Sequence, residues 1–289
     1  MNGAELSGLK SYERVAKGLA YVPQGRMIFS TMTVKENIET GLVVSGESEV
    51  PRDIYELFPV LLEMKGRRGG NLSGGQQQQL AIARALATKP KVLLLDEPLS
   101  NLDAKLREEM QFELRGIQQR VGTTTIMVTH DQSEALSMSD RVVVMERGRI
   151  MQVDAPYRLY ESPATPFISS FVGKMNRLSG VWRHGGVEIG GRVLPCEGAD
   201  LADGAAAVLE IRPEKISLRP RGAGVLDGQI KARFFLGGSW YFTVETPAGL
   251  IGVSLPNAGE EPAREADQVG LDWSNAGARA SKPDGAQPA

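Results

Sequence analysis

The stretch LSGGQQQQLAIARALATKPKVLLLDEP, residues 72–98, carries the strongest signal in the chain. Gly74 and Gly75 open a predicted helix and leave backbone N–H groups free to approach a phosphate, an anion that the helix dipole also favours. Ser73 adds a hydroxyl donor. Taken alone, this pattern also fits an ordinary glycine-rich helix start. The run KVLLLD (91–96) that follows predicts a strand in a parallel sheet that is covered on both faces.

Strands and helices alternate outward from this stretch, over about residues 15–175. The runs TTTIMVTH (123–130) and RVVVME (141–146) predict two further strands of the same kind. A helix is expected to begin after Asp103, a favourable N-cap residue. The apolar residues of that helix fall on one face at helical spacing: Leu106, Met110, Leu114, Ile117 and Val121. The region therefore predicts an α/β domain with a parallel sheet.

The pattern changes after about residue 178, where short β-like runs are broken by glycine and proline. Runs such as GQIKARFFLGG and SWYFTVETPAG predict a small antiparallel barrel. From about residue 258 the composition predicts a mostly disordered tail, in which VGLDWS (269–274) is a candidate edge strand. The expected division is residues 1–175 for the α/β domain, 176–257 for the β domain and 258–289 for the tail.

Composition excludes several classes of protein. Among 289 residues there are one cysteine and two histidines, which excludes a disulfide framework and argues against a cysteine- or histidine-rich metal centre. Basic and acidic residues nearly cancel to a net charge of −2, so charge gives no reason to expect nucleic acid. The N-terminus MNGAELSGLK has no apolar signal-peptide core, and no run approaches the ~20 apolar residues of a membrane span. We expect a cytoplasmic protein that reaches a membrane only through a partner.

Polar residues follow several of the predicted strands. Asp96 ends a buried strand, where carboxylates of nucleotide-binding α/β proteins hold Mg²⁺. Glu97 follows at once, placed to orient or activate a water. His130 ends the next strand, and the amide of Gln24 follows the apolar start of YVPQGR. Each signal alone also fits a structural role, as a strand terminus for the carboxylates and as a structural imidazole for the histidine.

Taken in chain order, YVPQ, LSGGQ, VLLLDEP, SNLD and VTH resemble the nucleotide-binding subunit of ABC transporters over about residues 15–175. The resemblance implies the following roles: Gln24 as the Q-loop glutamine, Leu72, Ser73, Gly74, Gly75 and Gln76 as the signature motif, Asp96 as the Walker B aspartate, Glu97 as the catalytic carboxylate, Ser100 to Asp103 as the D-loop and His130 as the switch histidine. It also implies ATP and Mg²⁺ as cofactors, with Asp96 and Gln24 as magnesium ligands. The stretches EIRPEKISL (210–218) and FFLGGSWYFTVETPAG (234–249) resemble the small OB-like TOBE domain of solute-importer ATPases.

One departure from this family concerns the motif that binds the phosphates. A P-loop needs G-x-x-x-x-G-K-[ST], whose backbone amides and lysine hold the β- and γ-phosphates. The one Gly-Lys dipeptide, Gly173–Lys174, is followed by Met175 and has no glycine five residues earlier. We therefore expect a P-loop NTPase fold truncated at its front by a unit on the order of 30 residues, the Walker A region. An isolated chain of this kind is expected to bind and hydrolyse ATP poorly.

A second departure concerns lineage. The front of the chain, with YVPQGRMIF and LSGGQQQQLAIARAL, resembles ATPases of branched-chain amino acid and urea importers. Beyond VLLLDEP, the stretches PLSNLDAKLREEM and THDQSEALSMSDRVVVM resemble ATPases for polyamines, phosphonates, iron or sugars. Our hypothesis is that the chain is a chimera joined at VLLLDEP. The two lineages point to different solutes, so the sequence identifies none.

The leading prediction is the ATP-binding subunit of an ABC importer, which couples ATP binding and hydrolysis to solute uptake. The resemblance implies three partners: permease subunits that hold the chain on the inner face of the cell membrane, a dimer with itself or with another ATPase subunit in which one signature motif meets the other P-loop, and indirectly a periplasmic solute-binding protein. The alternative is a hydrolysis-incompetent fragment or regulatory partner that docks on an intact ATPase. An ABC protein of DNA repair or translation is disfavoured, because those proteins lack a domain like residues 178–257 and this chain has no basic patch.

Overall fold

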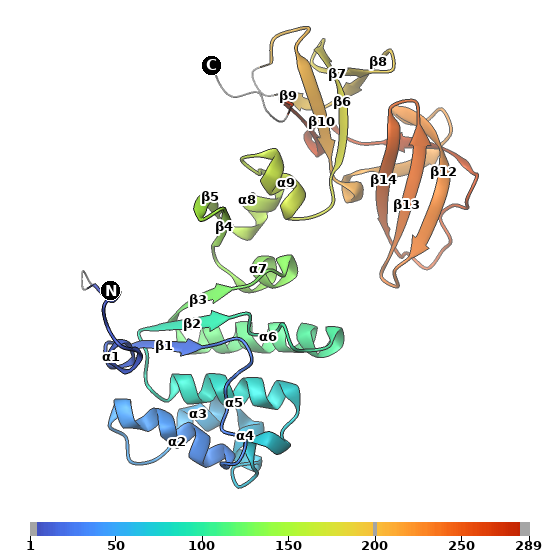
Figure 1. The fold of residues 1–289 in the computed structure, drawn as a ribbon. Coiled ribbons are helices and arrows are strands. Elements are labelled where there is room, and N and C mark those ends of the chain that lie inside the picture. Colours follow the sequence, from blue (N-terminus) through green and yellow to red (C-terminus); the bar gives the residue numbers. More distant parts are fainter. Residues whose placement is uncertain (1–4, 199–200, 284–289) are drawn as a thin grey trace. The chain divides into compact units, whose positions relative to one another are not determined.

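The computed structural model describes residues 5–198 and 201–283 of the chain (Figure 1). It forms two compact units, residues 1–142 and 143–289. The division lies earlier than the boundary expected at residues 175–176. Within the second unit, the segment just after residue 154 bonds to the β domain, as in the ion pair of 3.1 Å between Lys215 Nζ and Glu161 Oε1.

The first unit is built on a three-stranded parallel sheet in the order β1 (Leu19–Val22), β2 (Val92–Asp96) and β3 (Thr124–Val128). The parallel strands expected at 91–96 and 123–130 are thereby confirmed. Two long helices, α5 (Gly74–Leu86) and α6 (Ala104–Val121), lie along the sheet (Figure 1). The core between them contains alternate strand residues and apolar helix residues: Ala20, Val22, Leu93, Leu95, Leu80, Ile82, Met110, Leu114 and Ile117.

Shorter helices complete the first unit. They are α1 (Ser11–Ala16), α2 (Val34–Ser45), α3 (Arg52–Leu57), α4 (Pro59–Glu63), the single turn η1 (Gly69–Asn71) and α7 (Gln132–Met138). Gly41 lets α2 approach α5 closely, because a Cβ at Gly41 would lie 2.4 Å from the carbonyl oxygen of Arg84.

The opposite face of the sheet carries exposed apolar side chains. Tyr21 pairs in register with Leu94, and Leu94 with Ile126. Tyr21 is 54% exposed, Ile126 52% and Val128 58%. The expectation of a sheet covered on both faces is therefore wrong for the residues that the structure describes. Their helices pack on the other face, through the alternate residues of each strand.

The strand expected at 141–146 exists but does not join the parallel sheet. It is β4 (Val142–Glu146), and it pairs with β5 (Arg149–Asp154) in a two-stranded sheet. Arg147 and Gly148, which connect the two strands, have positive φ angles of 48° and 77°. A two-residue connection with both φ angles positive is typical of a tight β-hairpin, so the turn pairs β4 with the strand that follows it.

The second unit continues with α8 (Pro156–Glu161) and α9 (Pro166–Phe171) and then contains two sheets. One sheet has the order β8-β7-β6-β10-β16-β9, comprising β6 (Asn176–Arg183), β7 (Gly186–Ile189), β8 (Arg192–Pro195), β9 (Glu197–Gly198), β10 (Ala206–Ile211) and β16 (Ala278–Ser281). The other has the order β11-β15-β12-β13-β14, comprising β11 (Ser217–Pro220), β12 (Leu226–Phe235), β13 (Ser239–Thr246), β14 (Gly249–Pro256) and β15 (Gln268–Asp272). Single helical turns lie at η2 (Pro213–Lys215) and η3 (Asn275–Gly277).

The two sheets share one core instead of closing into the single barrel that we expected. The buried Asn176 of β6 joins them, because its amide donates to the carbonyl of Gly252 at 2.8 Å and accepts from the N–H of Gly252 at 2.7 Å. Between the two sheets, the side-chain amide of Asn176 thus makes the two hydrogen bonds that a backbone residue would make in a continuous β-ladder.

The expected disordered tail needs correction over residues 268–281. There β15 adds a strand to one sheet and β16 adds a strand to the other, with the turn η3 between them. Leu271 and Ala278 are fully buried. VGLDWS is therefore a strand, β15, placed between β11 and β12. Val269, Gly270 and Leu271 are buried in succession despite the low overall hydrophobicity of the segment. Residues 284–289 of the expected tail lie outside the described part of the chain.

Candidate functional site

Side chains that follow three adjacent strands meet at the carboxyl end of the parallel sheet. Gln24 follows β1, Glu97 follows β2 and His130 follows β3. Gln24 Nε2 donates to Glu97 Oε2 at 2.7 Å, and His130 Nδ1 lies 3.0 Å from Glu97 Oε1. The structure thus brings together three of the candidate site residues named from the sequence, with Glu97 at the centre. Crevices at the carboxyl ends of parallel strands are where α/β proteins bind ligands.

The backbone around Glu97 is held in an uncommon conformation. Its φ angle is +42°, in the left-handed region that few residues other than glycine adopt. The N–H of Glu97 donates to the carbonyl of Val128 at 2.8 Å, and the hydroxyl of Ser100 donates to the carbonyl of Glu97 at 3.0 Å. Residues held in such strained conformations cluster at functional sites, where surrounding contacts fix one side-chain direction.

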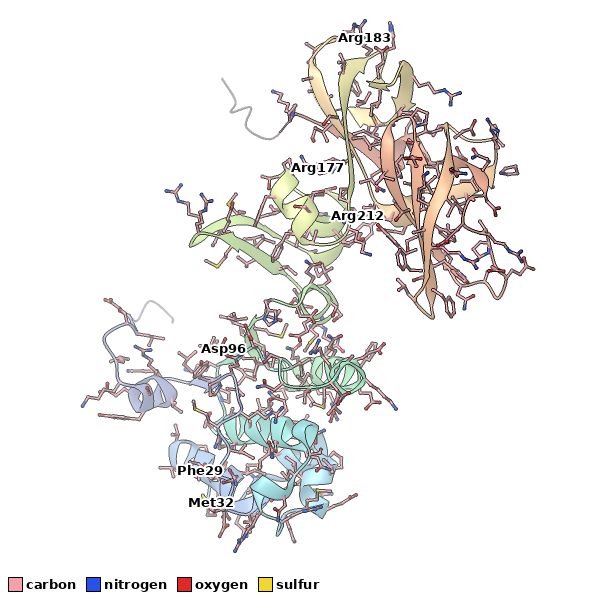
Figure 2. The ribbon with its side chains drawn as sticks, turned by 45° about the vertical axis from the view of Figure 1, so that its right-hand side comes forward. Phe29, Met32, Asp96, Arg177, Arg183 and Arg212 are labelled. Atoms are coloured by element: carbon pink, nitrogen blue, oxygen red, sulfur yellow. The ribbon has the colours of Figure 1, made fainter. Side chains whose placement is uncertain are left out.

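Asp96 lies beside this cluster, at the end of β2 (Figure 2). The phenol of Tyr21 donates to Asp96 Oδ2 at 2.8 Å, and this bond to a carboxylate raises the pKa of Tyr21. Tyr21 was not among the candidates predicted from the sequence. Its direction was predictable, because in LAYV the tyrosine alternates with the two buried residues Ala20 and Val22 and so points to the face that carries Asp96.

The predicted signature motif begins α5. The N–H of Gln76 donates to the hydroxyl of Ser73 at 3.3 Å, and the Gln76 amide accepts from the N–H of Ser73 at 3.0 Å. This reciprocal pair is a capping box, which fixes the first turn of the helix. Leu72, which precedes the cap, is buried.

The two glycines of the motif also have a packing role. A Cβ at Gly74 would lie 3.2 Å from Leu102 Cδ2, and one at Gly75 would lie 3.2 Å from Leu106 Cδ1. The start of α5 therefore lies directly against the loop 100–103 and the first turn of α6. Asp103 begins that helix, accepting at 3.0 Å from the N–H of Leu106, as the sequence predicted.

Arg26 links the predicted motifs and was missed by the sequence analysis. Its guanidinium donates to Gln77 Oε1 at 3.1 Å and to the carbonyl of Asn101 at 3.2 Å, and burial lowers the pKa of Arg26. The position lies two residues after Gln24, in a loop where Gly25, Arg26 and Met27 all have positive φ angles. Among the described residues, no hydrogen bond joins 72–76 directly to Gln24, Glu97 or His130, so Arg26 and the loop 100–103 connect the two parts of the site.

The donor set at the carboxyl end of β2 suits a hard cation. Within the described ranges, no group of three or more His, Cys, Asp or Glu residues is gathered as a metal site. Mg²⁺ does not require one, since it uses one or two carboxylates and takes its remaining oxygens from water and phosphate. Asp96 Oδ1 and Gln24 Oε1 are oxygens that the hydrogen bonds to Tyr21 and Glu97 leave available. The residues present therefore fit Mg²⁺ held together with a phosphate ligand.

Two family models match the chain. The model described as ABC transporter matches residues 1–100, and the model described as TOBE domain matches residues 209–280. The predicted fold class is thereby confirmed as an ABC ATPase domain followed by a β domain of the TOBE type. No described helix is long and apolar enough to cross a membrane.

Curated relatives match longer parts of the chain. It is 48% identical over 206 residues to the sulfate/thiosulfate import ATP-binding protein CysA 2 of Chromobacterium violaceum, covering 69% of this chain and 56% of that protein. It is 40% identical over 263 residues to the spermidine/putrescine import ATP-binding protein PotA of Rubrobacter xylanophilus, covering 86% of this chain and 68% of that protein. With the ABC transporter ATP-binding protein YdcT of Escherichia coli it shares 40% identity over 283 residues, covering 94% of this chain and 78% of that protein.

The relatives are longer than the part that matches. The chain spans 56% and 61% of the length of two sulfate/thiosulfate import proteins that it matches. Identities of 40% over two thirds or more of PotA and YdcT nevertheless show the relationship. The chain therefore belongs to the family of ABC transporter ATP-binding proteins.

Proposed function

We propose that this protein is an ATP-binding subunit of an ABC importer and acts on ATP held between two subunits. The convergence of Gln24 and His130 on Glu97 carries the proposal. Glu97 is the carboxylate that orients and activates the attacking water, and His130 and Gln24 hold it in place from the two neighbouring strands. The import function follows the names of the sulfate/thiosulfate and spermidine/putrescine relatives.

Asp96 and Gln24 are the proposed magnesium ligands. Bound with ATP, Mg²⁺ neutralises charge that develops on the transferred phosphoryl group. The residues of this chain contribute position: Tyr21 fixes one oxygen of Asp96, and Glu97 fixes the amide of Gln24. These two hydrogen bonds orient the proposed ligand oxygens of Asp96 and Gln24, so no further metal-binding residue is needed to position them.

The signature motif serves a nucleotide on the facing subunit of a dimer. Ser73, Gly74 and Gln76 lie at the N-terminus of a 13-residue helix, whose backbone N–H groups and dipole favour an anion. The P-loop that meets this signature motif belongs to the facing subunit, whereas the 289 residues of this chain contain no G-x-x-x-x-G-K-[ST] stretch of their own beside Glu97. Residues 1–289 by themselves are then expected to turn over little ATP. Permease subunits at the cytoplasmic face of the membrane are the further partners of the assembly, and a solute-binding protein acts through them.

The change of lineage at VLLLDEP (92–98) stays a hypothesis about the origin of the chain. Continuous long-read sequencing of the source locus across codons 80–110 tests it. Two separate genes at that place support an assembly artefact, and a single uninterrupted reading frame contradicts an artefact and leaves a recombined gene.

Association with an intact relative tests the proposed function. The experiment mixes this chain with CysA 2 of Chromobacterium violaceum in a hydrolysis-deficient form and follows sedimentation velocity with and without Mg-ATP. We expect a heterodimer that forms only with ATP. Ser73→Asp keeps an N-cap residue but adds a negative charge where phosphate would bind, so it is expected to abolish the heterodimer. Ser73→Thr, which keeps both the cap and the hydroxyl, is the matched control. An ATP-independent heterodimer that survives Ser73→Asp would instead support a regulatory partner that docks elsewhere, and no heterodimer at all would refute both readings.

A further inference from the structure

The loop 100–103 connects the two parts of the candidate site in the first unit. At its start, the hydroxyl of Ser100 donates to the carbonyl of Glu97 at 3.0 Å. At its end, Leu102 is buried, and its Cδ2 would lie 3.2 Å from a Cβ on Gly74, the first residue of α5. The position of the signature motif relative to Glu97 therefore depends on the conformation of these four residues.

Arg26 holds one backbone carbonyl of this loop. Its guanidinium donates to the carbonyl of Asn101 at 3.2 Å and to Gln77 Oε1 at 3.1 Å. Because Gln77 lies near the start of α5, one planar group joins the loop to the helix that carries the signature motif. The φ angle of Arg26 is +69°, a conformation that glycine or asparagine adopts at lower cost. An arginine at such a position points to a role for its side chain.

Arg107 of α6 holds the next carbonyl. Its guanidinium donates to the carbonyl of Leu102 at 3.0 Å and forms an ion pair of 3.5 Å with Asp131 Oδ2. Asp131 directly follows His130 and caps α7. The side chains of Arg107 and Asp131 keep only 32% and 26% of their surface, so salt screens this pair less than one at the surface. Arg107 therefore joins the loop to the segment that carries His130.

These contacts restrict the loop more than its hydrogen bonding requires. Successive carbonyls, those of Asn101 and Leu102, accept from arginines of two different segments. Asn101 is exposed, so water can satisfy its carbonyl without Arg26. A guanidinium instead presents its donors in a fixed planar arrangement and limits where both acceptors can lie. Such restriction matters where groups must be held within about 0.5 Å of a productive geometry.

We propose that Arg26 and Arg107 are positioning residues, which hold loop 100–103 so that the signature motif and Glu97 keep a fixed arrangement. The inference rests on the proposed function, since it assumes that the signature motif meets a nucleotide of the facing subunit. Neither arginine needs to touch that nucleotide. Loss of either guanidinium should leave the first unit folded but weaken its ATP-dependent association with a partner.

The Kd of the heterodimer with hydrolysis-deficient CysA 2, measured by sedimentation velocity in saturating Mg-ATP, tests the proposal. Arg26→Asn removes the guanidinium and introduces a residue that tolerates the positive φ angle. Arg107→Gln keeps a good helix former in α6. Each variant is expected to raise the Kd about tenfold, the loss of one hydrogen bond to a charged group. The double variant should stay well below the roughly hundredfold product, because both arginines act through the same loop.

Two further variants separate position from fold and from charge. Arg115→Gln is the matched control, since Arg115 also lies on α6 and bonds to the carbonyl of Met138 at 3.0 Å and to Asp140, at the end of α7 away from the loop. Its Kd should be unchanged. Arg26→Lys keeps the charge but donates from a single nitrogen, so it should retain most of the loss. Full recovery with lysine would assign the effect to charge and contradict a positioning role.

The fold of each variant is checked separately. Fluorescence of the three tryptophans reports only the second unit, so circular dichroism at 222 nm over a urea series follows the first unit. With the first unit folded, a Kd within about twofold of that of the unaltered chain for both arginine variants refutes the inference, as does a double variant at the full product. The proposed function survives either result. If the unaltered chain forms no ATP-dependent heterodimer, the proposed function fails, and the inference fails with it.

Discussion

Glu134 shows how burial changes the pKa of a single carboxylate. It lies on α7 and is 2% exposed, whereas the side chain of Glu97 keeps 26% of its surface. Thr129 donates to Glu134 Oε2 at 2.7 Å. Burial raises the pKa of Glu134, although this hydrogen bond opposes the shift. The pKa of Glu134 is higher in the folded than in the unfolded protein. The contribution of Glu134 to the free energy of unfolding is therefore fully present below about pH 4.5 and is lost as pH rises through the folded pKa.

Replacement of Glu134 by glutamine should therefore stabilise the first unit at pH 7. Glutamine keeps an oxygen that accepts from Thr129 but carries no charge to desolvate, so the gain should shrink toward pH 4.5. Urea unfolding followed by circular dichroism at 222 nm measures it, since the long helices lie in the first unit. Glu108→Gln, at an exposed position of α6, should leave the pH dependence unchanged. A Glu134→Gln variant that is less stable at pH 7 would contradict the burial argument.

At the residue scale, the sequence predicted the members of the cluster better than their contacts. Gln24, Glu97 and His130 were identifiable because each follows a strand, and ends of parallel strands meet at one edge. Tyr21 and Arg26 were not predicted: the alternation in LAYV indicates the face of Tyr21 but not its partner, and the partners Asp96 and Asn101 each lie 75 residues away in the chain. Such contacts depend on the register of β1 against β2, which local pattern does not reveal.

Among the elements, α6 depends on its first residue. Asp103 accepts from the N–H of Leu106, and the 18-residue helix then buries Met110, Leu114 and Ile117 against the sheet. Asp103→Ala removes that acceptor and should lower the free energy of unfolding of the first unit by about 1 kcal/mol. Asp103→Asn, which retains a capping oxygen, should lie within a few tenths of a kcal/mol of the unaltered chain. Equal urea midpoints for the alanine and asparagine variants would show that the cap contributes nothing.

Some elements were misplaced by the sequence-based prediction, because their positions depend on turns and on strand pairing. β4 has the apolar run of a buried strand, but Arg147 and Gly148 form a tight turn that pairs it with β5. β15 and β16 come from a segment of low hydrophobicity, yet β15 buries three successive residues and β16 buries Ala278 and Ala280. Composition averaged over the segment concealed these short buried runs.

For the whole molecule, the division into two units predicts separate reporters of folding. Cys196 is buried in the second unit, and burial raises the pKa of its thiol to about 11. Because the thiolate is the reactive form, the native protein should resist alkylation at pH 8. In a urea series, iodoacetamide labelling measured by mass spectrometry should follow tryptophan fluorescence, which also reports the second unit. Full labelling within minutes in the absence of urea would contradict the burial of Cys196.

The architecture of the whole chain was largely predictable from its periodicities. A change from alternating strands and helices to short β runs separates the ATPase part from the TOBE part, and two family models match those parts. The open face of the parallel sheet was not predictable, since an apolar strand such as VLLLD has the same sequence whether one or both faces are covered. The exposure of Tyr21, Ile126 and Val128 became visible only in the structure.

ATP hydrolysis by the purified chain is the most direct test of the central claim, that Glu97 acts on ATP only where a P-loop, which residues 1–289 do not contain, holds the phosphates. The measurement is magnesium-dependent phosphate release, with EDTA as the blank and Glu97→Gln as the comparison. We predict no release above the blank from either form of the chain alone. Magnesium-dependent release that Glu97→Gln abolishes would contradict the account, because these 289 residues would then hold and hydrolyse ATP without a P-loop.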